Sequence, residues 1–125
     1  MSDPDIPVVD ERVLSEVMES TGDDIGFVQE LVETYLADTP AQLDAIAAAV
    51  EADDAAALVR PAHTLKSSSA TVGAMRLSSV ARELEMAGRS GSLGPEARTV
   101  LDAARLESKA AADAIAAWLE RASVE

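Results

Sequence analysis

The chain of 125 residues lacks cysteine and has only three aromatic side chains, one each of Phe, Tyr and Trp. Without thiols it cannot form disulfides, a thiolate metal site or a cysteine nucleophile. Histidine occurs once, so any imidazole chemistry depends on His63. No apolar run approaches the roughly 18 residues of a membrane span. The first residues also lack the basic and apolar regions of a signal peptide, and we therefore expect a cytoplasmic protein that does not enter a membrane.

Basic residues are scarce as well, since 10 Lys and Arg stand against 23 Asp and Glu, for a net charge of -13. Nucleic acid binding is thereby disfavoured, because affinity for phosphate backbones requires clustered positive charge. Residues 1–59 carry fifteen acidic residues and one basic residue, whereas residues 60–92 carry five basic residues and two acidic ones. Charged helix faces often serve solvation alone. The coincidence of the basic stretch with His63 nevertheless favours an anion near that surface.

Apolar residues recur at helical spacing, and no segment alternates as a strand would. We predict an all-α protein, an antiparallel four-helix bundle with one short extra helix capping an end. The four long helices are expected at about 23–51, 54–72, 75–88 and 95–122, and the short one at about 11–20. Residues 10–125 should form one domain that follows a disordered tail at residues 1–9.

Two prolines, Pro40 and Pro61, fall inside the predicted helices. Proline removes a backbone hydrogen bond and bends a helix, but it does not always end one. We therefore expect one kinked helix across Pro40 and a bend just before His63.

Helical geometry predicts that His63 points away from the bundle core. Each residue of an α-helix turns by about 100°, so Lys66 lies one turn from His63 on nearly the same face, with Ser67 beside it. The residues that should face inward lie on the opposite side of this helix: Leu58, Ala62, Leu65, Ser69 and Val72. A lone helical histidine is more often structural, but this one should be accessible to a large partner.

The residues around His63 resemble a known family. The segment Ala-His-Thr-Leu-Lys-Ser-Ser-Ser-Ala at 62–70, then Val-Gly-Ala at 72–74, Leu77 and Arg-Glu-Leu-Glu at 82–85, is similar to the histidine-containing phosphotransfer (HPt) domain of phosphorelays. Thr-Gly-Asp at 21–23, followed by Phe27, Leu31 and Tyr35, matches that family's second helix, so the resemblance covers about residues 10–90. It implies an exposed histidine on a four-helix bundle that accepts a phosphoryl group from the aspartate of one receiver domain and passes it to another.

The resemblance also implies roles for individual residues. His63 would be the phosphoacceptor, Lys66 would hold the phosphoryl oxygens, and Glu85 would hydrogen-bond the imidazole nitrogen that does not carry phosphate. Arg89 and Ser67 would lie near the same site. Many members have glycine where this chain has Ser67, a difference that we expect to alter partner preference more than transfer.

The partners that the resemblance implies are response-regulator receiver domains and a hybrid histidine kinase. The chain itself should be a monomer that needs no cofactor or metal of its own, with magnesium brought by the receiver. An apolar docking surface for receivers would combine residues of the first two helices with two neighbours of His63: Val13, Val17, Phe27, Leu31, Val59 and Thr64. The first four could instead only pack the short helix onto the bundle, and both alternatives stay open.

Other classes of function fit the sequence less well. A serine hydrolase needs an acid that orients the imidazole and an oxyanion hole, which an exposed helix face does not provide. An ATP-dependent kinase is disfavoured because no Gly-rich phosphate loop is present, so the chain should be a phosphotransfer intermediate and not an autonomous enzyme. A non-catalytic helical adaptor that binds receiver domains without phosphotransfer is the alternative.

Overall fold

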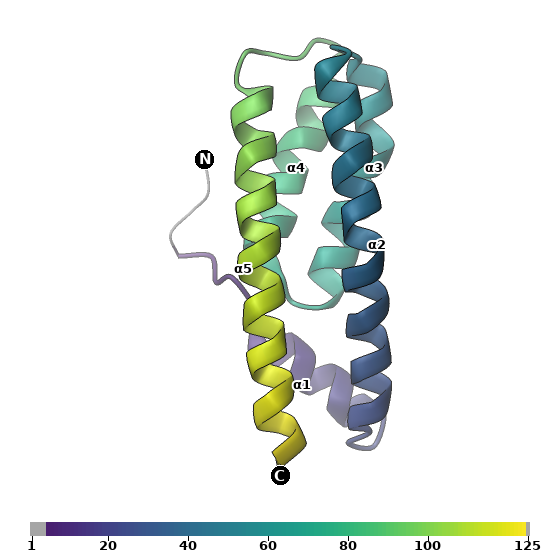
Figure 1. Cartoon of the computed structure of the whole chain (residues 1–125), viewed down its shortest axis with the longest axis vertical. Coiled ribbons are helices and arrows are strands. Elements are labelled where there is room, and N and C mark those ends of the chain that lie inside the picture. The colour runs from purple at the N-terminus through teal and green to yellow at the C-terminus, as the bar shows by residue number, and fades with distance from the viewer. Residues whose placement is uncertain (1–4, 125) are drawn as a thin grey trace.

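The computed structural model describes residues 5–124, which form five helices and no strand. The helices are α1 (Glu11–Ser20), α2 (Ile25–Glu51), α3 (Ala55–Thr71), α4 (Met75–Arg89) and α5 (Ala97–Val124). Helices α2 to α5 run alternately up and down as an antiparallel bundle, and α1 lies across one end (Figure 1). The predicted all-α bundle with a short capping helix is therefore confirmed.

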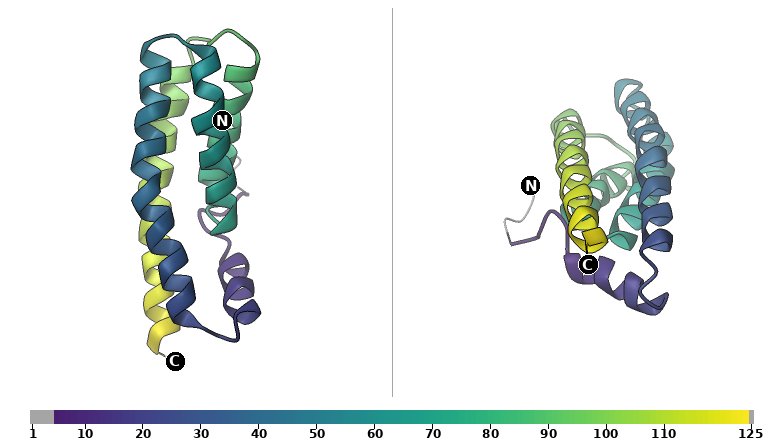
Figure 2. Two further views of the ribbon diagram at one scale, coloured as in Figure 1. Left: turned by 90° about the vertical axis from the view of Figure 1, so that its right-hand side faces the viewer. Right: turned by 60° about the horizontal axis from the view of Figure 1, so that its bottom comes forward.

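The four bundle helices differ in length, and this difference makes room for α1. Helices α2 and α5 have 27 and 28 residues, whereas α3 and α4 have 17 and 15. The α3–α4 hairpin therefore ends part way along the bundle, and α1 lies beneath its turn (Figure 2). The backbone N–H of Asp10 donates to the carbonyl oxygen of Gly73 over 2.7 Å, which ties the start of α1 to that turn.

Two Asp-Asp pairs start α2 and α3 in the same way. The second member of each pair, Asp24 or Asp54, is the N-cap, and its carboxylate accepts from the backbone N–H three residues on over 3.1 Å. The first member, Asp23 or Asp53, has a left-handed φ of 61° or 52°. Helix α2 consequently begins two residues after the predicted position, because Asp23 belongs to the turn.

The remaining helix limits lie within two residues of those predicted. Pro40 lies inside α2 and Pro61 inside α3, and neither proline ends its helix. The expected single helix across Pro40 is therefore confirmed, while the bends at the two prolines stay predictions.

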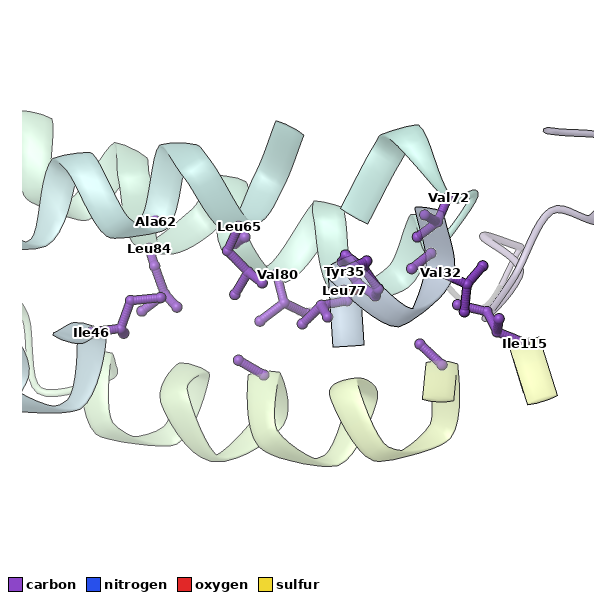
Figure 3. Packing of buried hydrophobic residues seen from close by; sticks show 14 of the residues in the cluster. Val32, Tyr35, Ile46, Ala62, Leu65, Val72, Leu77, Val80, Leu84 and Ile115 are labelled. Carbon is purple, nitrogen blue, oxygen red and sulfur yellow. The ribbon is translucent and has the colours of Figure 1, made fainter. Parts of the chain in front are cut away.

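The core lies between the four long helices along the bundle axis (Figure 3). The inward face predicted for α3 is buried throughout, from Leu58 to Val72. It meets Leu77, Val80 and Leu84 of α4, while α2 and α5 close the core from the other side. Burying this stripe fixes the rotation of α3 about its own axis. His63 is thereby held on the outside of the bundle.

The expected disordered tail is wrong for residues 5–9. Val8 and Val9 pack against the core, and the Arg76 side chain donates from Nε to the carbonyl oxygen of Ile6 over 2.6 Å. Apolar burial and this bond hold the segment on the bundle. The part of the prediction on residues 1–4 lies outside the described residues. Between residues 5 and 124, no helix has the length and apolar character needed to cross a membrane.

Candidate functional site

His63 lies on the outer face of α3, and 53% of its side chain is exposed. The buried stripe of Ala62 and Leu65 on the same helix holds it there. Its Nδ1 atom is 2.9 Å from Oε2 of Glu85 on the neighbouring helix α4. The predicted contact between Glu85 and the imidazole is thus present in the structure.

Glu85 joins all the charged residues predicted for the site. Its Oε1 atom accepts from Nζ of Lys66 over 2.7 Å. Its Oε2 atom accepts from Arg89 over 2.9 Å to Nε and 2.7 Å to Nη2, as well as facing His63. Only 5% of the Glu85 side chain is exposed. A single buried carboxylate therefore links two cations and the imidazole.

The two cations decide the protonation state of Glu85. Hydrogen bonds from Lys66, then Arg89 and to a smaller extent His63 together lower its pKa to about 2, against the opposing effect of burial. The carboxylate is consequently ionised at neutral pH and can only accept hydrogen bonds.

An ionised Glu85 assigns the tautomer of the imidazole. Because Oε2 can only accept, the proton of the neutral ring resides on Nδ1, which faces Glu85. The lone pair then lies on Nε2, at the other edge of an exposed ring. This arrangement can present a nucleophilic nitrogen to a large partner without a separate general base.

The sequence did not indicate that Lys66 is paired with Glu85. Lys66 was expected to face a bound anion, but its ammonium contacts the carboxylate, and 31% of its side chain is exposed. The two residues are 19 positions apart on different helices, so only the α3–α4 register brings them together. The pair of Glu85 and Arg89, by contrast, has the i, i+4 spacing and could be anticipated.

The predicted neighbours of His63 on α3 occupy three different environments. Ser67 is exposed one turn after the histidine, and Val59 is half-buried one turn before it. Thr64 is exposed and lines a groove of about 210 Å³ between α2 and α3, which Leu31 also lines. The structure therefore joins Leu31 and Thr64, the residue that follows His63 in the chain, in one concave surface.

The other members of the predicted apolar surface lie nearer the end of the bundle. Phe27 on α2 is 46% exposed. Val13 and Val17 on α1 are half-buried, and Val17 and Leu31 both pack against the core. Val17 and Leu31 thus help attach α1 and α2 to the core, and Phe27 is the most exposed of the four residues.

Within the described part of the chain, no group of three His, Cys, Asp or Glu side chains has the geometry to hold a metal ion. The same residues leave no buried side-chain nitrogen or oxygen without a hydrogen-bond partner. The groups that the site offers to a partner are therefore those at its surface.

Comparisons with known proteins agree with this arrangement. The model of the Hpt domain family matches residues 30–123. The crystal structure of histidine-containing phosphotransfer protein B (HptB) from Pseudomonas aeruginosa PAO1 is similar to the chain, with a TM-score of 0.81 and 30% sequence identity. That match covers 92% of this chain and 96% of the other. A search of curated proteins found no match.

Proposed function

The chain belongs to the Hpt domain family and acts in histidine phosphotransfer in phosphorelays, and we propose that His63 is its phosphoacceptor. One observation carries this assignment: Nδ1 of the exposed imidazole lies 2.9 Å from the buried carboxylate of Glu85. An ionised carboxylate in that place keeps the proton on Nδ1 and leaves the Nε2 lone pair free. Exposure alone would describe many surface histidines. Exposure together with a fixed tautomer favours a nucleophile.

In the proposed reaction, the Nε2 lone pair attacks the phosphorus of an aspartyl phosphate on a receiver domain. The N–P bond forms as the P–O bond to the aspartate breaks, and the aspartate leaves as a carboxylate. The ring keeps its Nδ1 proton and gains a positive charge, which Glu85 compensates across 2.9 Å. Transfer to a second receiver is the reverse of these steps, and no proton has to move in either direction.

In this scheme Lys66 can pair with either of two anions, the Glu85 carboxylate or the phosphoryl group on His63. It contacts Glu85 over 2.7 Å in the resting site, and its flexible stem can carry the ammonium toward phosphoryl oxygens on Nε2. Arg89 would keep Glu85 partly neutralised during that movement, because it donates twice to Oε2. Lys66 would thus stabilise the phosphoryl group without leaving a buried carboxylate unpaired.

Receiver domains and kinases are the partners with which Hpt proteins work. We infer that a hybrid histidine kinase is one of them and that magnesium comes with the receiver. A cytoplasmic monomer would suit this shuttle, since the exposed site must meet two partners in turn. The groove lined by Leu31 and Thr64, extended by Phe27, is the surface that we propose for receiver docking.

Incubation with a phosphorylated receiver tests the assignment of His63. We expect the protein to acquire label that is labile in acid and stable in base, and His63→Gln to abolish that label while far-UV circular dichroism stays unchanged. Lys109→Gln provides a matched control, because it removes an exposed basic side chain on α5. Label that persists in His63→Gln would contradict the assignment.

The adaptor alternative has its own outcome in the same experiment. An adaptor would bind receivers, as followed by chemical-shift changes along the groove, and yet acquire no label from any of them. Binding with the same affinity before and after receiver phosphorylation, without transfer, would favour the adaptor over the shuttle.

A further inference from the structure

Helices α3 and α4 are in close contact at Gly88, one turn beyond Glu85 on α4. A Cβ atom placed on Gly88 would lie 2.8 Å from the carbonyl oxygen of Ala55 and 2.9 Å from Cγ2 of Val59. It would also lie 3.3 Å from the backbone nitrogen of Val59. Two of these three atoms belong to the α3 backbone and cannot turn aside as a side chain can. Gly88 is therefore required here for space.

On each helix, this contact lies one turn from a residue of the site, His63 on α3 and Glu85 on α4. Val59 precedes His63 by four residues on α3, and Gly88 follows Glu85 by three residues on α4. Because the two helices are antiparallel, the Gly88 contact and the bond between His63 and Glu85 are successive steps along one interface.

On the other side of the site, Ser78 joins the same two helices. Its hydroxyl donates to the carbonyl oxygen of Lys66 over 2.9 Å. The bond between His63 and Glu85 thus lies between two fixed points, the Gly88 contact and the Ser78 bond.

We propose that Gly88 is a positioning residue for His63, because its missing side chain sets the α3–α4 distance at which Glu85 reaches Nδ1. A Cβ atom would have to withdraw by about 0.6 Å to move from 2.8 Å to ordinary contact at 3.4 Å. Arg89 lies on the same helix and donates to the Glu85 side chain, so the carboxylate would withdraw together with α4. The 2.9 Å contact with His63 then lengthens beyond the usual hydrogen-bond range.

The proposal rests on the proposed function for its catalytic consequence, but its structural claim can be measured without phosphate. His63 is the only histidine, so the imidazole nitrogen-15 signals of the labelled protein come from one ring. At a pH where the ring is neutral, these signals report which nitrogen carries the proton. We expect mainly the Nδ1-protonated form in the parent chain and a mixture in Gly88→Ala, with Glu85→Ala showing the effect of losing the contact outright.

Gly26→Ala is the matched control for this substitution. Gly26 is also helical, but a Cβ atom there meets only the flexible Asp24 side chain, at 3.2 Å. We expect Gly26→Ala to keep the parent tautomer and transfer rate. Transfer from a phosphorylated receiver should slow by at least about tenfold in Gly88→Ala, since small displacements of reacting groups are costly. Parent-like imidazole signals in a folded Gly88→Ala would overturn the proposal.

Ser78→Ala decides the question if Gly88→Ala does not fold. Loss of the Ser78 bond should shift the tautomer in the same direction, whereas Ser79→Ala at the adjacent position should not. Equal spectra for the two serine variants would overturn the proposal. If the spectra change as expected and no variant, the parent included, accepts phosphate, then the proposed function fails and the positioning role stands.

Discussion

At the scale of single residues, Glu85 organises the site because its two oxygens accept from three side chains while it is almost entirely buried. A buried carboxylate is costly unless its charge is paired and its lone pairs are used. Lys66 and Arg89 provide that pairing. Because Glu85 is ionised and can only accept a hydrogen bond, a neutral His63 ring must carry its proton on Nδ1, the nitrogen that faces Oε2.

Replacing Lys66 by Ala should shorten the lifetime of the phosphohistidine or slow transfer, by roughly tenfold. The expected loss is smaller than that for an oxyanion-hole donor in a closed site, because Lys66 is partly solvated. Loss of radioactive label with time measures the lifetime, and Lys66→Arg serves as the control that keeps the charge. Unchanged transfer and lifetime in Lys66→Ala would remove Lys66 from the phosphoryl site.

The acid stability of the protein should report the ion pairs of Glu85. Its pKa is lowered from 4.5 to about 2, so the folded state takes up this proton at lower pH than the unfolded state does. The stabilisation is complete above about pH 4.5 and is lost as pH falls toward 2. Between these limits, the free energy of unfolding measured with urea should rise more steeply with pH in the parent than in Glu85→Gln. The difference in slope should correspond to the uptake of up to one proton on unfolding. Identical slopes would contradict this account.

At the scale of elements, the turn between α3 and α4 couples the hairpin to the start of α1. Gly73 has a φ of 80°, and a Cβ atom there would lie 2.6 Å from the carbonyl oxygen of Asp10. The backbone bond from Asp10 to Gly73 lies at the same point. A glycine is needed here both for its conformation and for the close approach of α1.

Gly73→Ala should therefore destabilise the fold by more than its conformational cost, at least about 2 kcal/mol in total. Gly22→Ala is the matched control, since Gly22 also has a positive φ, of 72°, but a Cβ atom there meets nothing within 4 Å. Gly22→Ala should lower the free energy of unfolding by only about 1 kcal/mol. Chemical denaturation of both measures the difference, and equal losses would show that the contact with Asp10 contributes nothing.

At the scale of the whole molecule, the bundle separates two kinds of surface. The strongly acidic stretch 1–59 includes all of α1 and α2, whereas the five basic residues of 60–92 lie on α3 and α4, the two helices that carry His63 and Glu85. Glu85 neutralises part of that positive charge internally. The anion that the sequence predicts near His63 is therefore in part a side chain of the protein itself, a conclusion that charge counts along the chain could not reach.

What the sequence determined by itself was local. Asp caps, glycines and apolar periodicity place the five helices, and the same periodicity turns Leu58 and Leu65 inward and His63 outward, because these patterns act within a few residues. The resemblance to Hpt domains pointed to Glu85 and Lys66 as residues of the site. Their individual roles, and those of Ser67 and Val59, stay predictions.

The tertiary structure alone decided how these residues meet. The bond between Lys66 and Glu85, the close approach at Gly88 and the packing of Val8 and Val9 all join segments distant in sequence. Each depends on the separation and register of packed helices. A helical pattern specifies which face of a helix is buried, but not the distance between two helices, which only the packed side chains and a missing Cβ atom can set.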